Sequence, residues 1–483
     1  MSTSKLSAVL ALAAASSLLA ACAVGPNYQG PPNAAPVSTG AGHFHRAPEA
    51  DAAPAPPPSR WWEALNDATL NGLVEAALAD SPNIHSARAH LLSARAALGE
   101  SQTKLLPSGG ASAAELSARL PTSGLGQLTG GSQAQGQSQV ESLNLYSASF
   151  DATWELDIFG GQRRAIEAAA AQAGGQQAQL DDAQVELAAE VAQAYVNLRD
   201  DQTRLDLARR ELTLERQSLD LTTQRRQRGT AADGDIERVQ TQLQQLQADI
   251  PPLEADLQVR LDQLAMLTGR EPGALDAALT PAAAVPTPPA ATAIGDPAAL
   301  LRRRPDIREA ERKLAASNAK IGQQIAQFFP TVTLLGDVGF SASDPGQLFR
   351  STNFSALGAP SISWNLFNFP RIATQVRGAK ADRDAALDDY EQSVLSALQD
   401  AEGSLTRYGH QREAVDALVR AQASAQRAAV LVEGRYRAGV ATLIDLLDAQ
   451  RQAIDTEQSL AQGKAALTGD YISLQKSLGL GWS

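Results

Sequence analysis

The sequence predicts a mainly α-helical fold with a smaller β portion, built from one unit that occurs twice. The segment Trp154-Glu-Leu-Asp-Ile-Phe returns 210 residues later as Trp364-Asn-Leu-Phe-Asn-Phe. Further identities keep the same offset: Arg225, Gly229, Ala231, Asp235, Gln240 and Gln242 match Arg435, Gly439, Ala441, Asp445, Gln450 and Gln452. A repeat of roughly 200 residues is much longer than a solenoid repeat of about 20–50 residues, so we expect two similar lobes.

Upstream of the β portion the two copies keep a different offset. Pro82 and Pro305 are 223 residues apart, and so are Pro107 and Pro330. The offset changes by 13 only between Pro107 and Trp154, which means that one segment there is longer in the first copy.

The duplication organises the 483-residue chain into predicted segments. A signal peptide at 1–21 and a lipid-anchored, extended tether at 22–60 precede the first repeat. The boundaries that follow are a first repeat at 61–270 with a β-hairpin at 107–160, a Pro-rich linker at 271–300, and a second repeat at 301–483 with a β-hairpin at 330–370.

Long stretches without proline predict the helical part. Residues 161–228 and 371–437 contain none, and about 67 residues make roughly 100 Å of helix at 1.5 Å per residue. The leucine spacing between Leu243 and Leu267 predicts a coiled-coil seam, which Pro251-Pro252 should kink. Shorter helices are predicted at 81–105, 234–268, 304–329 and 441–478. Each copy is therefore expected to be one long helix beside a stacked pair of shorter ones.

Alternating side chains predict the β portion. From Tyr146 to Leu156 the even positions are apolar or small and the odd ones polar, and similar alternation follows Thr331 and Phe354. The strand after Pro107 is weaker and is inferred mainly from the duplication. Runs of about 10 residues have the length of a tilted transmembrane strand. A soluble sandwich is the alternative, but two hairpins separated by more than 100 helical residues fit it poorly.

The start of the chain is typical of a secreted lipoprotein. Lys5 precedes an apolar run at Leu6–Ala15, and Leu19-Ala-Ala-Cys22 resembles a bacterial lipobox in which Cys22 receives lipid. An ordinary signal peptide with an incidental cysteine is the alternative. Cys22 is the only cysteine, so no disulfide can form within the chain. No later run of ~20 apolar residues predicts a transmembrane helix, so any membrane crossing would have to use strands.

Composition and motifs argue against several classes of function. The net charge is −12 and no basic stripe is visible, so we expect no nucleic-acid partner. His43 and His45 lie without an acidic or cysteine cluster, which gives no reason to expect a metal site. We find no phosphate-binding loop and no catalytic constellation, and predict a protein that is not an enzyme and needs no cofactor.

Taken together, these residues resemble the TolC-like outer-membrane efflux channels, in their lipoprotein (OprM/NodT-type) branch. The matching motifs are Cys22-Ala-Val-Gly-Pro-Asn-Tyr28, Trp61-Trp62, Arg304-Pro-Asp-Ile307, Tyr436-Arg-Ala-Gly439 and Asp445-Leu-Leu-Asp448-Ala-Gln-Arg451. The resemblance implies a homotrimer in the bacterial outer membrane, with a shared 12-stranded β-barrel on a 12-helix periplasmic α-barrel. Four strands alone cannot close a barrel, which begins at about 8 strands, so strands that span a membrane would independently require oligomerisation.

The resemblance also implies a function. The chain would be the exit duct of a tripartite efflux pump, passively conducting drugs or other small molecules from the periplasm to the exterior. Its partners would be a periplasmic adaptor (membrane fusion) protein, an inner-membrane RND-type transporter and outer-membrane lipid. The alternative is a lipid-anchored periplasmic coiled-coil scaffold without a pore, which would have no use for four amphipathic strands.

In this family a ring of side chains closes the periplasmic tip of the tunnel, and the matching residues here are Ile444, Asp445 and Asp448. Ile444 and Asp448 lie one helical turn apart and can face one way, as apolar and acidic rings that control passage. Asp445 matches Asp235, so an acid that favours a helix N-terminus is an equal alternative. Asp448 matches Arg238 instead, which suggests an acid–base contact that holds the tip shut.

Two tryptophans mark the junction between the β portion and the helices. Trp154 and Trp364 each end a strand pattern just before a long helix starts. Because tryptophan favours membrane–water interfaces, we predict that both lie at corresponding positions near the barrel–helix junction.

Overall fold

The computed structural model describes residues 23–46, 58–121 and 140–482, so the predicted signal peptide and Cys22 lie outside the described residues. The chain divides into two compact units. Unit 1 comprises Met1–Pro31, Ser93–Ala173 and Arg312–Leu387, and unit 2 comprises Pro32–Leu92, Gly174–Glu311 and Asp388–Ser483.

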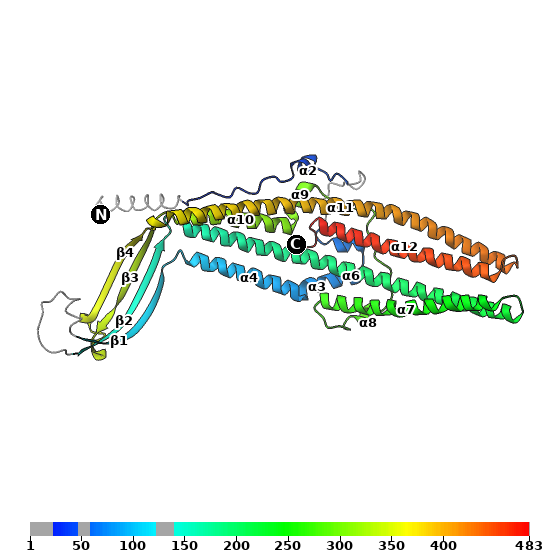
Figure 1. The fold of residues 1–483 in the computed structure, drawn as a ribbon, viewed down its shortest axis with the longest axis horizontal. Helices are drawn as coiled ribbons and strands as arrows, with labels where there is room; N and C mark the ends of the chain where they lie inside the picture. Colours follow the sequence, from blue (N-terminus) through cyan, green and yellow to red (C-terminus); the bar gives the residue numbers. More distant parts are fainter. Residues whose placement is uncertain (1–22, 47–57, 122–139, 483) are drawn as a thin grey trace. The chain divides into compact units, whose positions relative to one another are not determined.

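The elements follow the duplication closely (Figure 1). The first copy consists of η1 (Trp61–Leu65), α3 (Ala68–Asp80), α4 (Pro82–Thr103), β1 (Ser108–Pro121), β2 (Val140–Leu156), α6 (Gly161–Gln227) and α7 (Asp233–Leu267). The second consists of α9 (Pro297–Arg303), α10 (Pro305–Ala326), β3 (Thr331–Ala342), β4 (Phe354–Ser363), α11 (Phe369–Arg437) and α12 (Leu443–Ser477). The remaining short elements are α2 (Pro36–Ala41), α8 (Asp276–Leu279), η2 (Pro345–Gln347), η3 (Ser351–Asn353) and η4 (Leu366–Asn368).

The long helices match their predicted lengths. α6 has 67 residues and α11 has 69, because neither contains a proline beyond its first turn. α7 runs for 35 residues and is continuous through Pro251 and Pro252, where the sequence predicts a kink. None of the helices that the structure describes combines the length and the apolar character needed to cross a bilayer.

Identical turns join each long helix to its return helix in unit 2. Gly229 and Gly439 have φ angles of 77° and 74°, which a residue with a Cβ rarely adopts. The amide of Thr230 donates to the carbonyl of Arg225, and that of Val440 to that of Arg435, both at 2.9 Å. This is the bond pattern of a Schellman helix end, which satisfies carbonyls at the end of each long helix.

The sheet belongs to unit 1 and joins the two copies through its centre. Within the described residues its strand order is β1-β2-β3-β4, all antiparallel, with Trp154 opposite Leu334 and Phe150 opposite Val338. These four side chains lie on one face and remain between 36% and 53% exposed in the single chain. On the opposite face Asp151 lies directly across from Asp337, and Ser147 lies opposite Ser341. The predicted alternation is therefore present, and in the single chain the apolar face is exposed, as Asp151 and Ser341 on the opposite face also are.

The core of unit 2 forms where the short elements meet the long helices. Trp61 packs edge-on against Trp62 at 5.7 Å and against Tyr471 at 6.1 Å between ring centroids. The hydroxyl of Tyr471 donates to the carbonyl of Trp61 at 3.4 Å. The quoted Trp61-Trp62 motif therefore attaches the start of the first copy to the last helix of the second.

The stretch at 22–60, predicted as an extended tether, is mostly exposed where the structure describes it, and a few of its residues contact the folded units. It contains the helix α2, and Phe44 is only 1% exposed in the core of unit 2. The amides of His45 and Arg46 donate to the two carboxylate oxygens of Glu402 at 2.7 and 2.9 Å. These contacts attach the stretch to unit 2 at Phe44, His45 and Arg46, and its role as a tether stays a prediction.

Candidate functional site

The candidate site lies at the turn end of α6, α7 and α12 in unit 2. A pocket of about 430 Å³ is lined by four of the residues that the sequence indicates, Asp235, Arg238, Ile444 and Asp448. The other lining residues include Glu215, Ser218, Thr222, Arg225, Thr230, Gln242 and Arg451. The structure thus brings the predicted gate residues of both copies to one pocket, with Asp445 outside its lining.

Asp445 and Asp235 cap the helices that they begin. The carboxylate of Asp445 accepts from the amide and the hydroxyl of Thr442 at 2.8 and 2.7 Å, and its amide donates to that hydroxyl at 3.1 Å. Asp235 accepts from the amide of Ala232 at 3.1 Å. The hydrogen bonds from Thr442 lower the pKa of Asp445. For both residues these bonds support the alternative of an acid at a helix N-terminus.

Asp448 and Arg238 each have a partner on their own helix. Asp448 lies 3.8 Å from the guanidinium of Arg451, and Arg238 lies 3.6 Å from the carboxylate of Asp235. The side chains of Asp448 and Arg238 are 63% and 80% exposed. They line the same pocket, and a direct contact between them that holds the tip shut stays a prediction.

Arg451 makes the strongest link in this pocket. Its guanidinium donates to the carboxylate of Glu215 on α6 at 2.7 Å, and the Glu215 side chain is only 3% exposed. A buried carboxylate needs such a partner to remain charged. Arg451 ends the family motif that begins at Asp445, but the sequence alone indicated no contact for it. Its partner is 236 residues away on the other copy's long helix, and local spacing cannot reveal that pairing.

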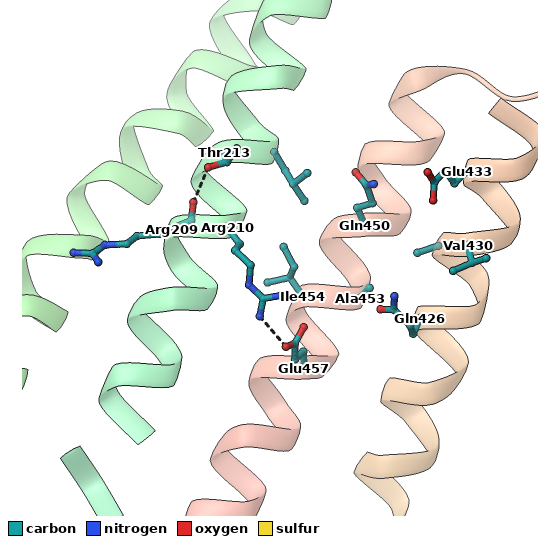
Figure 2. A pocket seen from close by; sticks show the side chains of 12 residues that line it. Arg209, Arg210, Thr213, Gln426, Val430, Glu433, Gln450, Ala453, Ile454 and Glu457 are labelled. Atoms are coloured by element: carbon teal, nitrogen blue, oxygen red, sulfur yellow. Dashed lines mark hydrogen bonds and ion pairs between the residues drawn. The ribbon is translucent and has the colours of Figure 1, made fainter. Parts of the chain in front are cut away.

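Further along the same helices, a second pocket of about 530 Å³ lies between α6, α11 and α12. Figure 2 shows Ile454, Ala453 and Val430 at its apolar part. Arg210 on α6 donates to Glu457 on α12 at 2.7 Å at one side of this pocket, while Arg209 points away to Glu254 on α7 at 2.7 Å (Figure 2). Two cross-copy ion pairs, Arg210–Glu457 and Arg451–Glu215, therefore hold α12 against α6.

A third cluster, also in unit 2, explains the quoted motif Arg304-Pro-Asp-Ile307. Arg304 makes two bonds with Asp306, at 3.0 and 2.6 Å, and donates to the carbonyl of Ser477, the last residue of α12, at 2.9 Å. The carboxylate of Asp400 on α11 lies 3.5 Å from the guanidinium of Arg304. A Cβ on Gly479 would stand 2.8 Å from the Arg304 side chain. The motif is a clasp for the C-terminal end of α12, whose last carbonyls lack helical partners.

Beside this clasp, burial raises the pKa of Asp182 to about 6. The carboxylates of Asp306, Glu186 and Glu309 raise it further, and Arg304 opposes them. The folded chain then binds a proton here more tightly than the unfolded chain, so this group's contribution to stability is lost as the pH rises from about 4 to 6.

We therefore expect Asp182→Asn to raise the melting temperature above pH 6 and to have little effect near pH 4. Thermal melts followed by circular dichroism between pH 4 and 8 measure this. Asp416→Asn, at an exposed carboxylate on α11, is the matched control and should not change the pH dependence. A D182N melting temperature that parallels the wild type at every pH would contradict the assignment.

The two predicted interface tryptophans make the same contact in unit 1. The indole of Trp154 donates to the carbonyl of Leu105, and that of Trp364 donates to the carbonyl of Phe328, both at 2.9 Å. Leu105 and Phe328 are 223 residues apart and each follows a short helix. Both tryptophans thus tie a strand end to the end of the helix before its hairpin, and their place at a membrane interface stays a prediction.

Comparison with known proteins agrees with this architecture. The family model described as "Outer membrane efflux protein" matches residues 73–270 and 297–480. The chain belongs to the outer membrane efflux protein family. It is 30% identical over 479 residues to the solvent efflux pump outer membrane protein SrpC of Pseudomonas putida, covering 96% of this chain and 97% of that one. It is 28% identical over 468 residues to nodulation protein T of Rhizobium leguminosarum bv. trifolii, covering 96% of each.

Solved structures place the fold in the same family. The outer-membrane channel OprN is 34% identical, with a TM-score of 0.84 over 95% of this chain and 100% of that chain. The CmeC outer membrane channel of Campylobacter jejuni, at 19% identity and a TM-score of 0.83 over 96% of each chain, shares the fold. The resemblance to TolC-like channels, the mainly helical duplicated fold and the assignment to outer-membrane efflux are confirmed.

Proposed function

We propose that this outer membrane efflux protein forms the exit duct of a tripartite pump and conducts small molecules passively out of the periplasm. The observation that carries the proposal is the sheet of unit 1, in which Trp154, Phe150, Leu334 and Val338 share one face while Asp151 and Asp337 lie on the other. A strand with lipid on one side and water on the other requires this division. A periplasmic scaffold without a pore gives no reason for it.

The unpaired edges of the sheet support assembly as a homotrimer. Among the strands that the structure describes, β1 and β4 each have one neighbour, and open strand edges are not tolerated in lipid. Three copies related by a threefold axis would join β1 of one protomer to β4 of the next and close the twelve strands. The helical strands would then form the periplasmic tunnel. Trimer migration in detergent gels, lost on heating, tests this assembly.

The proposed partners are a periplasmic adaptor protein and an inner-membrane RND-type transporter, since a passive duct needs an energised pump. Cells that lack their own outer-membrane efflux protein, but carry an adaptor and such a transporter, should regain dye export when this chain is expressed. Export should stop when the proton gradient is collapsed. The proposal would be contradicted if the trimer reached normal levels but exported no dye when it was co-expressed with each adaptor and transporter encoded beside its gene.

We also propose that Cys22 carries the lipid anchor. The lone cysteine after Leu19-Ala-Ala supports this, and the residue itself lies outside the described part of the chain. Cys22→Ser should abolish incorporation of labelled palmitate and leave an unprocessed precursor. Labelling of the serine variant at the wild-type level would show that the acyl chain is attached elsewhere.

A further inference from the structure

Residues 23–28 lie as an ordered strap on the first turns of α6 and on α10, all within unit 1. The amide of Val24 donates to the carbonyl of Phe159, between the end of β2 and the start of α6, at 3.1 Å. The guanidinium of Arg164 donates to the carbonyls of Val24 and Gly25 at 3.1 and 3.2 Å. The strap is therefore held by its backbone, which makes its position independent of most of its side chains.

Two buried polar side chains serve this contact. Arg164 is 4% exposed, and its bonds to the strap include one to the side chain of Asn27 at 2.6 Å. Arg164 also donates to the carboxylate of Glu167 at 2.7 Å. Asn318 of α10, 6% exposed, donates to the carbonyl of Pro26 at 3.1 Å. Buried polar groups of this kind are costly unless they are bonded, so these helices carry groups that the strap is needed to satisfy.

The strap and α10 also approach too closely for any side chain. Gly25 has a φ of 93°, and a Cβ there would stand 2.4 Å from the Cα of Gly322. A Cβ on Gly322 would stand 2.8 Å from the carbonyl oxygen of Val24. The two glycines are therefore required by steric fit, in addition to the backbone conformation at Gly25.

The duplication shows that this docking site is specific to one position. Arg164 corresponds to Thr374 at the 210-residue offset, and Asn318 corresponds to Arg95 at the 223-residue offset. Gly322 corresponds to Gly99, around which a Cβ would meet nothing within 4 Å among the described residues. One copy of the site has the arginine, the asparagine and the strap, while its counterpart has none of the three.

We propose that Arg164, Asn318 and Gly322 form a docking site for the chain's own residues 23–28, which fixes the point of lipid attachment beside the strand–helix junction of unit 1. The lipid-anchored end of the chain would then be attached to the folded protein from residue 24 onward. Residues 23–28 would not act as a flexible linker. The position of the lipid rests on the proposed attachment at Cys22, whereas the docking of residues 23–28 is tested separately.

The test compares two glycines that share a positive φ. Gly25→Ala should displace the strap, whereas Gly30→Ala, with a φ of 101° and nothing within 4 Å of its Cβ, should not. The measurement is hydrogen–deuterium exchange of the 23–31 peptide in the purified full chain, together with the rate of chymotrypsin cleavage after Tyr28. We expect Gly25→Ala to increase both by about tenfold or more, as loss of charge-assisted bonds and local opening imply.

Arg164→Ala should give the same result as Gly25→Ala, with Arg377→Ala, an exposed arginine on α11, as its control. Asn318→Ala removes a single hydrogen bond and should leave the protein fully assembled, with a smaller increase in exchange and cleavage. It therefore provides the test if the other variants fold poorly. Palmitate labelling should be unchanged in all of them. Exchange and cleavage at the wild-type level in Gly25→Ala, Arg164→Ala and Asn318→Ala would overturn the docking site.

Discussion

Asp448→Ala is expected to raise the resting conductance of the assembled protein in planar bilayers and to lower its preference for cations. In a trimer three copies of Asp448 would form an acidic ring, and three copies of Ile444 an apolar one. The acid attracts cations, and the apolar ring restricts passage by excluding water. Both side chains line one pocket at the tip and are partly exposed, at 63% for the Asp448 side chain and 37% for Ile444.

The double variant Asp448→Ala with Ile444→Ala should conduct more than either single variant, because both rings are then removed. Asp389→Ala, in the first third of α11 and 48 residues before its last residue, Arg437, is the control and should behave like the wild type. Wild-type conductance and selectivity in the double variant, with the trimer intact, would remove the basis for a gate at these residues.

Arg451→Ala should have the other large effect, on stability and on conductance together. Removing the arginine leaves the carboxylate of Glu215 buried without its 2.7 Å partner. Loss of a hydrogen bond to a charged group costs roughly 1.5–3 kcal/mol. α12 would then be held to α6 at this end mainly by Arg210–Glu457, so the tip should open more readily and the melting temperature should fall.

A double-mutant cycle separates this link from a general loss of packing. Arg451→Met with Glu215→Leu replaces both charges by apolar side chains and should recover most of the stability lost in Arg451→Ala. If the ion pair holds the tip closed, the conductance of this double variant should stay above that of the wild type. The apolar pair cannot form the directional hydrogen bond between Arg451 and Glu215. Arg451→Lys keeps the positive charge but lacks the planar guanidinium. Its melting temperature and conductance should lie between those of the wild type and of Arg451→Ala. A melting temperature and a conductance unchanged in Arg451→Ala would show that the link is not needed.

Local patterns predicted most of the fold. Absence of proline located both long helices to within two residues at each end, and the alternation from Tyr146 to Leu156 located β2. The 210-residue offset even predicted the equal positions of Gly229 and Gly439. Pairings between distant segments were beyond reach, because nothing near Glu215 in the sequence indicates Arg451. The strap was missed for another reason: Gly25 and Pro26 are also typical of a linker, and only the contact with Gly322 distinguishes the two.

At the candidate site the sequence indicated which residues lie together, but not the contacts that they make. Ile444, Asp448, Asp235 and Arg238 do line one pocket. The carboxylates of Asp445 and Asp235 cap the N-termini of their helices, which agrees with the alternative interpretation of an acid at a helix N-terminus. The proposed arrangement of these residues around a threefold axis would depend on other copies of the chain, which local spacing cannot describe.

The central claim is that this chain forms a continuous water-filled duct. It is tested most directly by adding the purified, full-length protein at high dilution to a planar bilayer and recording single insertions. The account predicts discrete, uniform conductance steps that are cation-preferring and that disappear when the trimer is dissociated by heat before addition. A trimer that enters the bilayer, as shown by its recovery from the membrane, yet produces no steps even as Asp448→Ala with Ile444→Ala, would contradict the duct and favour a scaffold.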